Sequence, residues 1–133
     1  MKAALDQLYD SFNAPDTAAD PIQIVRRYSD VRDREIVAFI AAGLAFGRVA
    51  SVMASIETVI GLMGASPAAF VRQFDARRDG PRFAWFVHRW VRGKEVTALF
   101  VTLRRMLDEF GSIEACFASG YDPLHEDLAA AIE

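Results

Sequence analysis

The sequence has little of several residue types that mark particular classes of protein. It contains one cysteine, Cys116, which excludes a disulfide within the chain and fits a reducing cytoplasm. This cysteine and the two histidines, His88 and His125, do not have the spacing of a zinc site. No glycine-rich G-x-G-x-x-G loop is present to hold a phosphate group. We therefore expect no metal and no cofactor.

Long uninterrupted apolar runs are also missing. A membrane-spanning helix needs about 20 apolar residues, and Arg48 interrupts the long apolar stretch of this chain. Near the N-terminus, Asp6 and Asp10 stand where a signal peptide would have its apolar core. We therefore expect a cytoplasmic protein with no membrane segment.

The length of 133 residues is enough for one domain with a buried core. The sequence stops in LAAAIE, with neither a capping residue nor a glycine after the apolar pattern. We therefore expect residues 1–133 to be a single helical domain and the N-terminal part of a longer protein.

Apolar residues recur at helical spacing, and no segment alternates as a strand does. The pattern predicts an all-α fold of about seven helices, with helix as the only regular structure. Helical spacing or an N-terminal cap marks the candidate segments, several of them short: residues 1–12, a short segment from Asp20-Pro21, a segment capped by Ser29 or Asp30 and ended by Gly47, 49–63, 66–74, 82–90, 94–110, a short segment after Ser112, and a last one from Tyr121-Asp122-Pro123. Residues 76–81 are predicted to form a loop.

The same periodicity selects the side chains of the core. Seven of them should be almost fully buried: Ile36, Phe39, Ile40, Val52, Ile56, Leu99 and Leu103.

Charge is unevenly distributed along the chain, although its formal net charge is only −3. Residues 72–94 contain seven Lys or Arg and two acids, whereas residues 108–133 contain seven acids and no Lys or Arg. A surface that merely solvates a fold usually mixes the two signs. The segregation predicts an anionic partner, such as nucleic acid, for the middle of the chain and a cationic surface, within this protein or outside it, for the acidic end.

Arg48 lies at the junction of the two predicted central helices. It could cap the carbonyl end of the first helix, or pair with Asp33 or Glu35. Alternatively, its guanidinium could bind a phosphate at the mouth of a pocket.

The run His88-Arg89-Trp90 also has two interpretations. Trp90 could be a core anchor, with His88 bonded to the backbone and Arg89 in solvent. Because the run lies in the basic stretch, it could instead contact phosphates and stack on a base. The nucleic-acid-binding candidates are therefore Arg48, Arg78, Arg82, His88, Arg89 and Lys94, with Arg78, Arg82, Arg89 and Lys94 expected on a shared surface.

Four segments carry a resemblance to a known family: 20–48 (DPIQIVRRYSDVRDREIVAFIAAGLAFGR), 66–74 (SPAAFVRQF), 86–90 (FVHRW) and 107–117 (LDEFGSIEACF). Together they resemble the domain of unknown function 2400 family of bacterial proteins. Chains of that family are longer, and their second half resembles the helix-hairpin-helix DNA glycosylases. The resemblance implies an orthogonal multi-helix bundle like the N-terminal part of those glycosylases.

The glycosylase resemblance implies a scaffold that contacts DNA. In such enzymes a glycine-rich hairpin grips the DNA backbone and a catalytic aspartate follows it, and neither occurs in this sequence. No other complete catalytic motif is present, so the catalytic residues stay unknown and we expect no base excision from these 133 residues.

Two alternatives remain open. The chain could be a non-catalytic helical interaction domain, which would expose an apolar face of its central and C-terminal helices to a protein partner or to the missing C-terminal half. It could also be a small-molecule enzyme that uses the corner at Arg48.

Overall fold

The computed structural model describes residues 2–12 and 20–121. The described part is mainly helical, with eight α-helices, one 3-10 helix (η1) and one two-stranded sheet. The elements in chain order are α1 (Lys2–Phe12), α2 (Ile22–Arg26), α3 (Val31–Gly43), α4 (Val49–Met63), α5 (Pro67–Arg72), α6 (Ala76–Asp79), η1 (Gly80–Phe83), β1 (Val87–His88), β2 (Val91–Arg92), α7 (Gly93–Phe110) and α8 (Ile113–Gly120).

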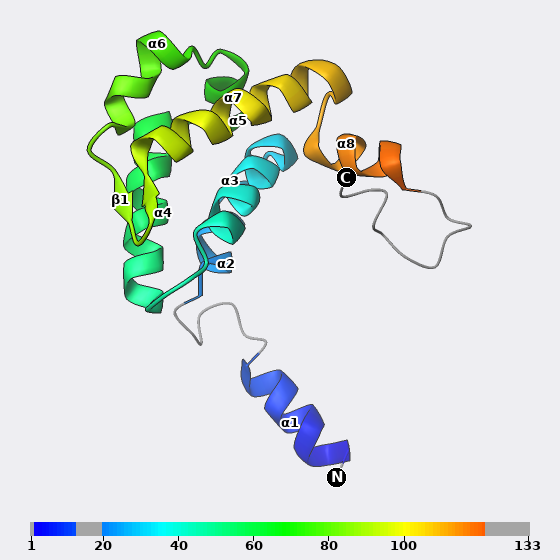
Figure 1. Ribbon diagram of the computed structural model, residues 1–133. Coiled ribbons are helices and arrows are strands. Elements are labelled where there is room, and N and C mark those ends of the chain that lie inside the picture. Colours follow the sequence, from blue (N-terminus) through cyan, green and yellow to red (C-terminus); the bar gives the residue numbers. More distant parts are fainter. Residues whose placement is uncertain (1, 13–19, 122–133) are drawn as a thin grey trace.

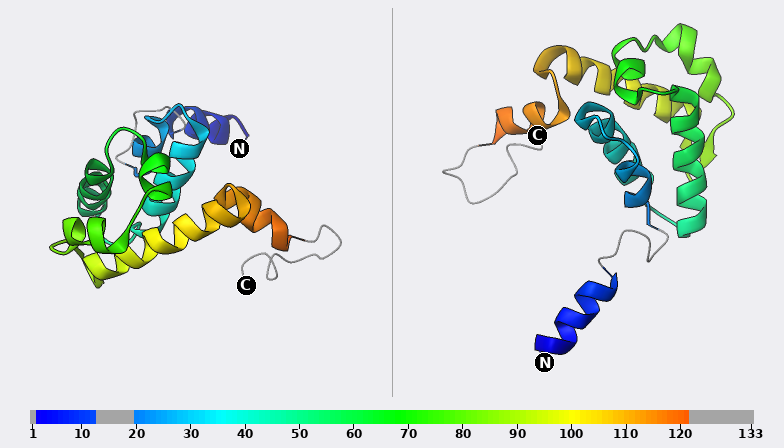
Figure 2. Two further views of the ribbon diagram at one scale, coloured as in Figure 1. Left: turned by 90° about the horizontal axis from the view of Figure 1, so that it is seen from above. Right: turned by 180° about the vertical axis from the view of Figure 1, so that it is seen from behind.

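The long helix α7 runs across the top of the body, above α3 and transverse to α4 (Figure 1). Seen from above, α4 is viewed nearly end-on while α7 runs across the molecule (Figure 2). Helix α5 contacts both α3 and α7, and α8 turns back from the end of α7. Helix α1 stands apart from this body in Figure 1, and its described side chains are exposed.

Local chemistry accounts for the ends of these helices. Side chains at the N-terminal caps accept hydrogen bonds from otherwise unpaired backbone N–H groups. Asp30, Ser66 and Ser112 do so for α3, α5 and α8, as their sequences predict. Gly47 and Gly111 have φ angles of 112° and 86°, a conformation that favours glycine, and each lies just beyond a predicted helix end.

Most of the predicted core is confirmed. Ile36, Ile40, Val52, Ile56 and Leu103 are almost fully buried, and Leu99 is partly buried. The prediction for Phe39 was wrong, since 40% of this residue is exposed. Its neighbours Val37 and Ile40 face the core instead, because α3 presents those positions to the helices packed on it.

Two predictions between residues 76 and 92 were wrong. Residues 76–79 form the short helix α6 rather than a loop, because Asp75 caps it through the N–H groups of Arg77 and Arg78. Residues 82–90 do not form an aromatic helix. The chain leaves η1 and forms an antiparallel hairpin in which Val87 pairs with Arg92 and His88 with Val91. Helix is therefore not the only regular structure.

The last predicted helix, from Tyr121-Asp122-Pro123, lies almost entirely outside the described residues, as do residues 122–133 of the acidic end. Among the residues that the structure describes, no helix is long and apolar enough to cross a membrane.

Acid should weaken the caps of α3 and α6 in a defined pH range. Hydrogen bonds from Arg32 lower the pKa of Asp30 from 3.8 to about 2, and hydrogen bonds from Arg78 lower the pKa of Asp75 and of Asp79. A carboxyl group with a lowered folded-state pKa stabilises the fold above its unfolded-state pKa, and this contribution is lost as the pH falls through the folded-state value. We therefore expect the free energy of unfolding to fall between about pH 4 and about pH 2.

Urea unfolding at a series of pH values measures this dependence. Asp30→Asn keeps a side-chain oxygen for the cap but cannot titrate, so it should flatten part of the acid slope. A profile with the same acid slope in this variant and in the wild type would contradict the assignment.

Candidate nucleic-acid interface

His88 fastens the hairpin to the corner between α3 and α4. Its ring is only 4% exposed, with Nε2 3.1 Å from the carbonyl oxygen of Phe46 and Nδ1 2.8 Å from Oγ of Ser55. Because a carbonyl oxygen can only accept, Nε2 donates to Phe46, and in the tautomer with that single proton Nδ1 accepts from the Ser55 hydroxyl. The predicted bond between His88 and the backbone is thus present, and His88 itself is hidden from any large ligand.

Trp90 does not anchor the core. Its ring stacks on Phe46 with a centroid distance of 4.4 Å and an interplanar angle of 8°, and 72% of the residue is exposed. The Phe46 ring also contacts His88, at a centroid distance of 4.8 Å. Phe46 therefore holds the hairpin tip in place while leaving most of Trp90 open to solvent.

Arg89 has an unusual backbone at the same tip. Its φ of 56° makes it the only non-glycine residue with positive φ in the described chain. For a residue with a side chain, this conformation costs about 1–2 kcal/mol. Strain of this kind persists where the surrounding structure enforces it and often marks a functional site.

The guanidinium of Arg89 lies over Gly47. A Cβ atom at Gly47 would come within 2.9 Å of Nε and 3.0 Å of Nη2 of Arg89. The absence of a side chain at Gly47 thus gives Arg89 its place beside Arg48, the next residue in the chain.

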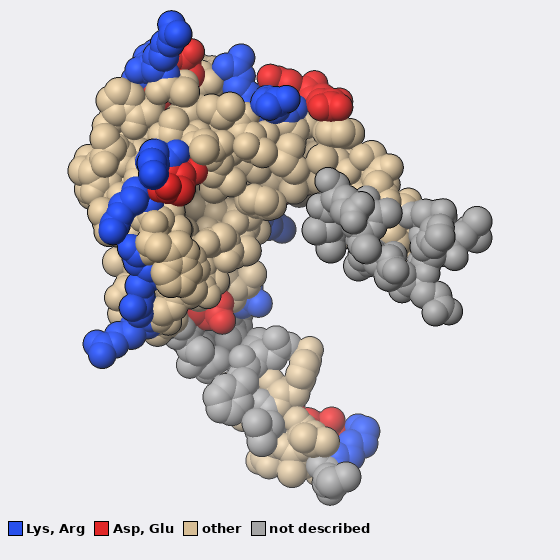
Figure 3. Space-filling view, viewed as in Figure 1, with Lys and Arg blue, Asp and Glu red and all other residues tan. Residues whose placement is uncertain are grey.

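Basic side chains form a strip along one edge of the molecule, over the hairpin and the N-terminal end of α4 (Figure 3). We define the basic edge as Arg48, Arg89, Arg92 and Lys94, all of which are exposed. One acid lies among these cations: the exposed Glu95 accepts from the backbone N–H of Arg92 at 2.9 Å through Oε2, and its Oε1 lies 3.5 Å from Nζ of Lys94. The basic edge thus combines four cations with the exposed face of Trp90.

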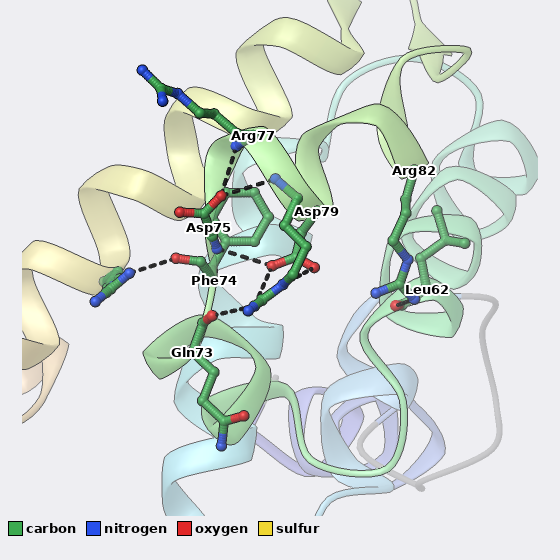
Figure 4. Close-up of polar contacts among 9 residues, drawn as sticks. Leu62, Gln73, Phe74, Asp75, Arg77, Asp79 and Arg82 are labelled. Carbon is green, nitrogen blue, oxygen red and sulfur yellow. Dashed lines mark hydrogen bonds and ion pairs between the residues drawn. The ribbon is translucent and has the colours of Figure 1, made fainter.

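Arg78 and Arg82 lie in a different environment. Nε and Nη2 of Arg78 donate to the carboxylate of Asp79 at 3.1 and 2.8 Å, and Nη2 also donates to the carbonyl of Gln73 at 2.6 Å. Arg82 points to the carbonyl of Leu62, to which it donates (Figure 4).

Both arginines line a hollow of about 300 Å³ next to Met63 and Phe70, and the guanidinium of Arg82 lies 5.5 Å from the centre of the Phe70 ring. Arg77 points away from the network in the same view (Figure 4). Arg48, His88, Arg89 and Lys94 therefore lie on the hairpin side of the molecule. Arg78 and Arg82 instead form hydrogen bonds to backbone carbonyls within the fold.

The acids expected near Arg48 have other partners. Asp33 accepts from Oγ of Ser66 at 2.9 Å and from the N–H of Ala68 at 2.8 Å, and Glu35 accepts from the N–H of Glu114 at 2.6 Å. Within residues 2–12 and 20–121, neither acid pairs with Arg48. Arg48 directly precedes α4 and is exposed.

Three residues of the interface were not predicted from the sequence. Arg92 lies within the basic stretch, so its charge could have indicated it. Phe46 and Ser55 carry no comparable signal, since their roles depend on a hairpin that follows them by many residues.

The described residues contain no group of three or more His, Cys, Asp or Glu side chains that could hold a metal ion. Cys116 is partly buried, and His125, the other imidazole, lies outside the described residues. The contact of Ser55 with His88 could activate a hydroxyl, but the burial of His88 makes it a structural contact.

We expect Ser55→Ala to destabilise the protein by about 1 kcal/mol, because it leaves Nδ1 of the buried His88 ring without a partner. Chemical denaturation measures the change. Ser51→Ala is the matched control: Ser51 lies one turn earlier on α4 and is exposed, so this variant should change stability by less than about 0.5 kcal/mol. Equal effects at the two positions would argue against the structural role of His88.

Comparisons with known proteins give a match at the level of the family only. Neither the search of curated proteins nor the search of solved structures found a match. The model of the family described as "protein of unknown function (DUF2400)" matches residues 20–133, which include the corner, the hairpin and the basic edge. The chain therefore belongs to the DUF2400 family.

Proposed function

We propose that this protein contacts nucleic acid through the basic edge, on a helical scaffold of DNA-glycosylase-like ancestry. The observation that carries the proposal is the meeting of Arg48, from the corner before α4, with the cations of the hairpin beside the exposed Trp90. Arginine and lysine bind phosphates, and an exposed aromatic ring stacks on unpaired bases.

The scaffold part of the proposal rests on the order of the elements. A buried helix, a small-residue corner, a second helix and a short helix follow one another as α3, residues 44–48, α4 and α5. The sequence resemblance compares this order with the first half of a helix-hairpin-helix glycosylase. The corner supplies Arg48 to the interface, and the proposal assigns no catalysis to it.

Binding should be modest and sensitive to salt. If all four cations of the basic edge contact phosphates, the logarithm of the binding constant should fall with the logarithm of the salt concentration with a slope of about −3.6 on duplex DNA and about −2.8 on a single strand. The stacking of Trp90 should favour the single strand at equal charge. Fluorescence anisotropy of labelled oligonucleotides at a series of salt concentrations measures both quantities.

Arg89→Gly provides a sharp test, because glycine adopts positive φ without strain. This variant should keep or raise the melting temperature while weakening oligonucleotide binding by about threefold to tenfold. Arg48→Gln should weaken binding to a similar degree, whereas Arg105→Gln, at an exposed position of α7, should not. Unchanged binding in both interface variants, or no salt dependence, would refute the proposal.

The second candidate is a helical protein-interaction domain, favoured by apolar residues on α3 and α8. Phe39, Phe117 and Tyr121 are all exposed by 40% or more, and the contact of Glu35 with the N–H of Glu114 places α8 against α3. Sedimentation at a series of concentrations separates the two candidates. Self-association that Phe117→Ser abolishes, without oligonucleotide binding, would favour this second function.

A further inference from the structure

A hollow in the surface lies beside the basic edge. A hollow of about 490 Å³ lies between α6, η1 and the start of α7. Its lining consists of Ala76, Gly80, Pro81, Ala84, Arg92, Gly93, Lys94 and Thr97. Its volume lies within the range of about 300–1,000 Å³ that is usual for small-ligand sites.

Two glycines in the lining let the walls of this hollow approach each other closely. A Cβ atom at Gly93 would lie 1.9 Å from the carbonyl oxygen of Phe83, and one at Gly80 would lie 3.2 Å from Cγ2 of Thr97. The two glycines therefore let η1 pack directly on the first turns of α7, and the remaining floor consists of alanine and proline. No lining side chain other than Arg92 and Lys94 is long enough to fill the space.

The lining is mainly apolar, with polar groups at defined places. Arg92 and Lys94 are exposed and belong to the basic edge, so the hollow lies next to the proposed nucleic-acid interface. Oγ1 of Thr97 donates to the carbonyl of Gly93 at 2.9 Å, which leaves the hydroxyl oxygen able to accept from a ligand.

We infer that this hollow binds one nucleotide unit, with the planar base on the small-residue floor and the phosphate between Arg92 and Lys94. A bare phosphate would leave the apolar floor uncovered, and a purely apolar ligand would leave the two cations unused. The class of ligand rests on the proposed function. A free nucleotide and a nucleotide of a bound strand share this chemistry.

The test uses the whole chain and a deoxynucleoside monophosphate, with the corresponding nucleoside and inorganic phosphate as separate probes. Both tryptophans of the chain, Trp85 and Trp90, are exposed and flank this region in sequence, so their fluorescence can report binding. The monophosphate should bind about tenfold or more tightly than the nucleoside or phosphate alone, because only it uses both halves of the site.

Two variants fill the hollow from exposed positions: Ala84→Leu and Ala76→Leu. Each should weaken monophosphate binding by about tenfold, and Lys94→Gln should weaken it by about threefold to tenfold. Ala98→Leu and Arg105→Gln, at exposed positions of α7 outside the lining, are the matched controls and should leave binding unchanged. Circular dichroism tests whether each variant folds. If one filling variant does not fold, the other one still tests the inference.

The outcomes for the pocket and for the proposed function are distinct. Monophosphate binding that both filling variants leave intact, or no monophosphate binding up to about 10 mM, overturns the pocket inference. Oligonucleotide binding that is weakened by Arg48→Gln and not by Ala84→Leu retains the proposed function alone. Monophosphate binding that Ala84→Leu abolishes, with no oligonucleotide binding, retains the pocket as a site for free nucleotides and refutes the proposed function.

Discussion

Replacing Gly93 by alanine is expected to destabilise the protein by about 3 kcal/mol. Gly93 is the first residue of α7 and is buried. A Cβ atom there would lie 1.9 Å from the carbonyl oxygen and 2.6 Å from the carbonyl carbon of Phe83, and 2.9 Å from Cα of Ala84. These are backbone atoms, which no rotamer change can move aside, so η1 and α7 must separate and lose their packing.

Gly61→Ala is the matched control for this variant. Gly61 lies within α4, and no atom comes within 4 Å of the position of its added Cβ. Since alanine favours the helix over glycine by about 1 kcal/mol, Gly61→Ala should stabilise the protein slightly. Urea unfolding of both variants gives the comparison. If Gly93→Ala proves as stable as the wild type, the close contact of α7 with η1 is wrong.

Replacing Phe100 by alanine is expected to cost about 3–5 kcal/mol, the usual range for removing a buried phenylalanine. Phe100 is fully buried on α7. Its ring centre lies 5.6 Å from that of Phe70, and 5.1 Å from those of both Phe74 and Phe83. Phe100 thus links α7 to α5 through Phe70, to the segment just after α5 through Phe74, and to η1 through Phe83. A cavity at this point would weaken all three contacts.

Phe39→Ala is the matched control, because it removes the same atoms from a side chain that is 40% exposed. Its cost should stay below about 1.5 kcal/mol, and Phe100→Leu should fall between the two. Thermal and chemical unfolding measure all three variants. Equal losses at positions 39 and 100 would contradict the placement of the phenylalanine cluster at the centre of the core.

The helices and most of their ends could be predicted from the sequence because their causes are local. Asp30, Ser66 and Ser112 each bond to backbone groups two or three residues away, and Gly47 and Gly111 adopt their backbone conformations within a single turn. Apolar spacing selected Ile36, Ile40, Val52, Ile56 and Leu103 for the same reason, since a helix face is defined by residues three and four apart.

The hairpin could not be predicted in this way. Each strand has two residues, and the turn Arg89-Trp90 lacks the glycine or asparagine that usually signals a hairpin. What holds it is remote in sequence: the stacking of Trp90 on Phe46, and the bond of His88 to Ser55. Phe39 was misplaced for a similar reason, because the side of α3 that is covered depends on which helices pack there.

The candidate interface shows the same division. Counting charges along the chain identified a basic stretch, and its residue types account for the predicted affinity for anions. Folding then divides the stretch: Arg72 donates to the carbonyl of Gly111, and Arg78 and Arg82 donate to other carbonyls. Arg89 stays exposed over Gly47, next to Arg48 in the chain, and Arg92 and Lys94 are exposed as well. Composition and local periodicity thus predict which groups are available, whereas their grouping depends on contacts between distant segments, which a local pattern does not encode.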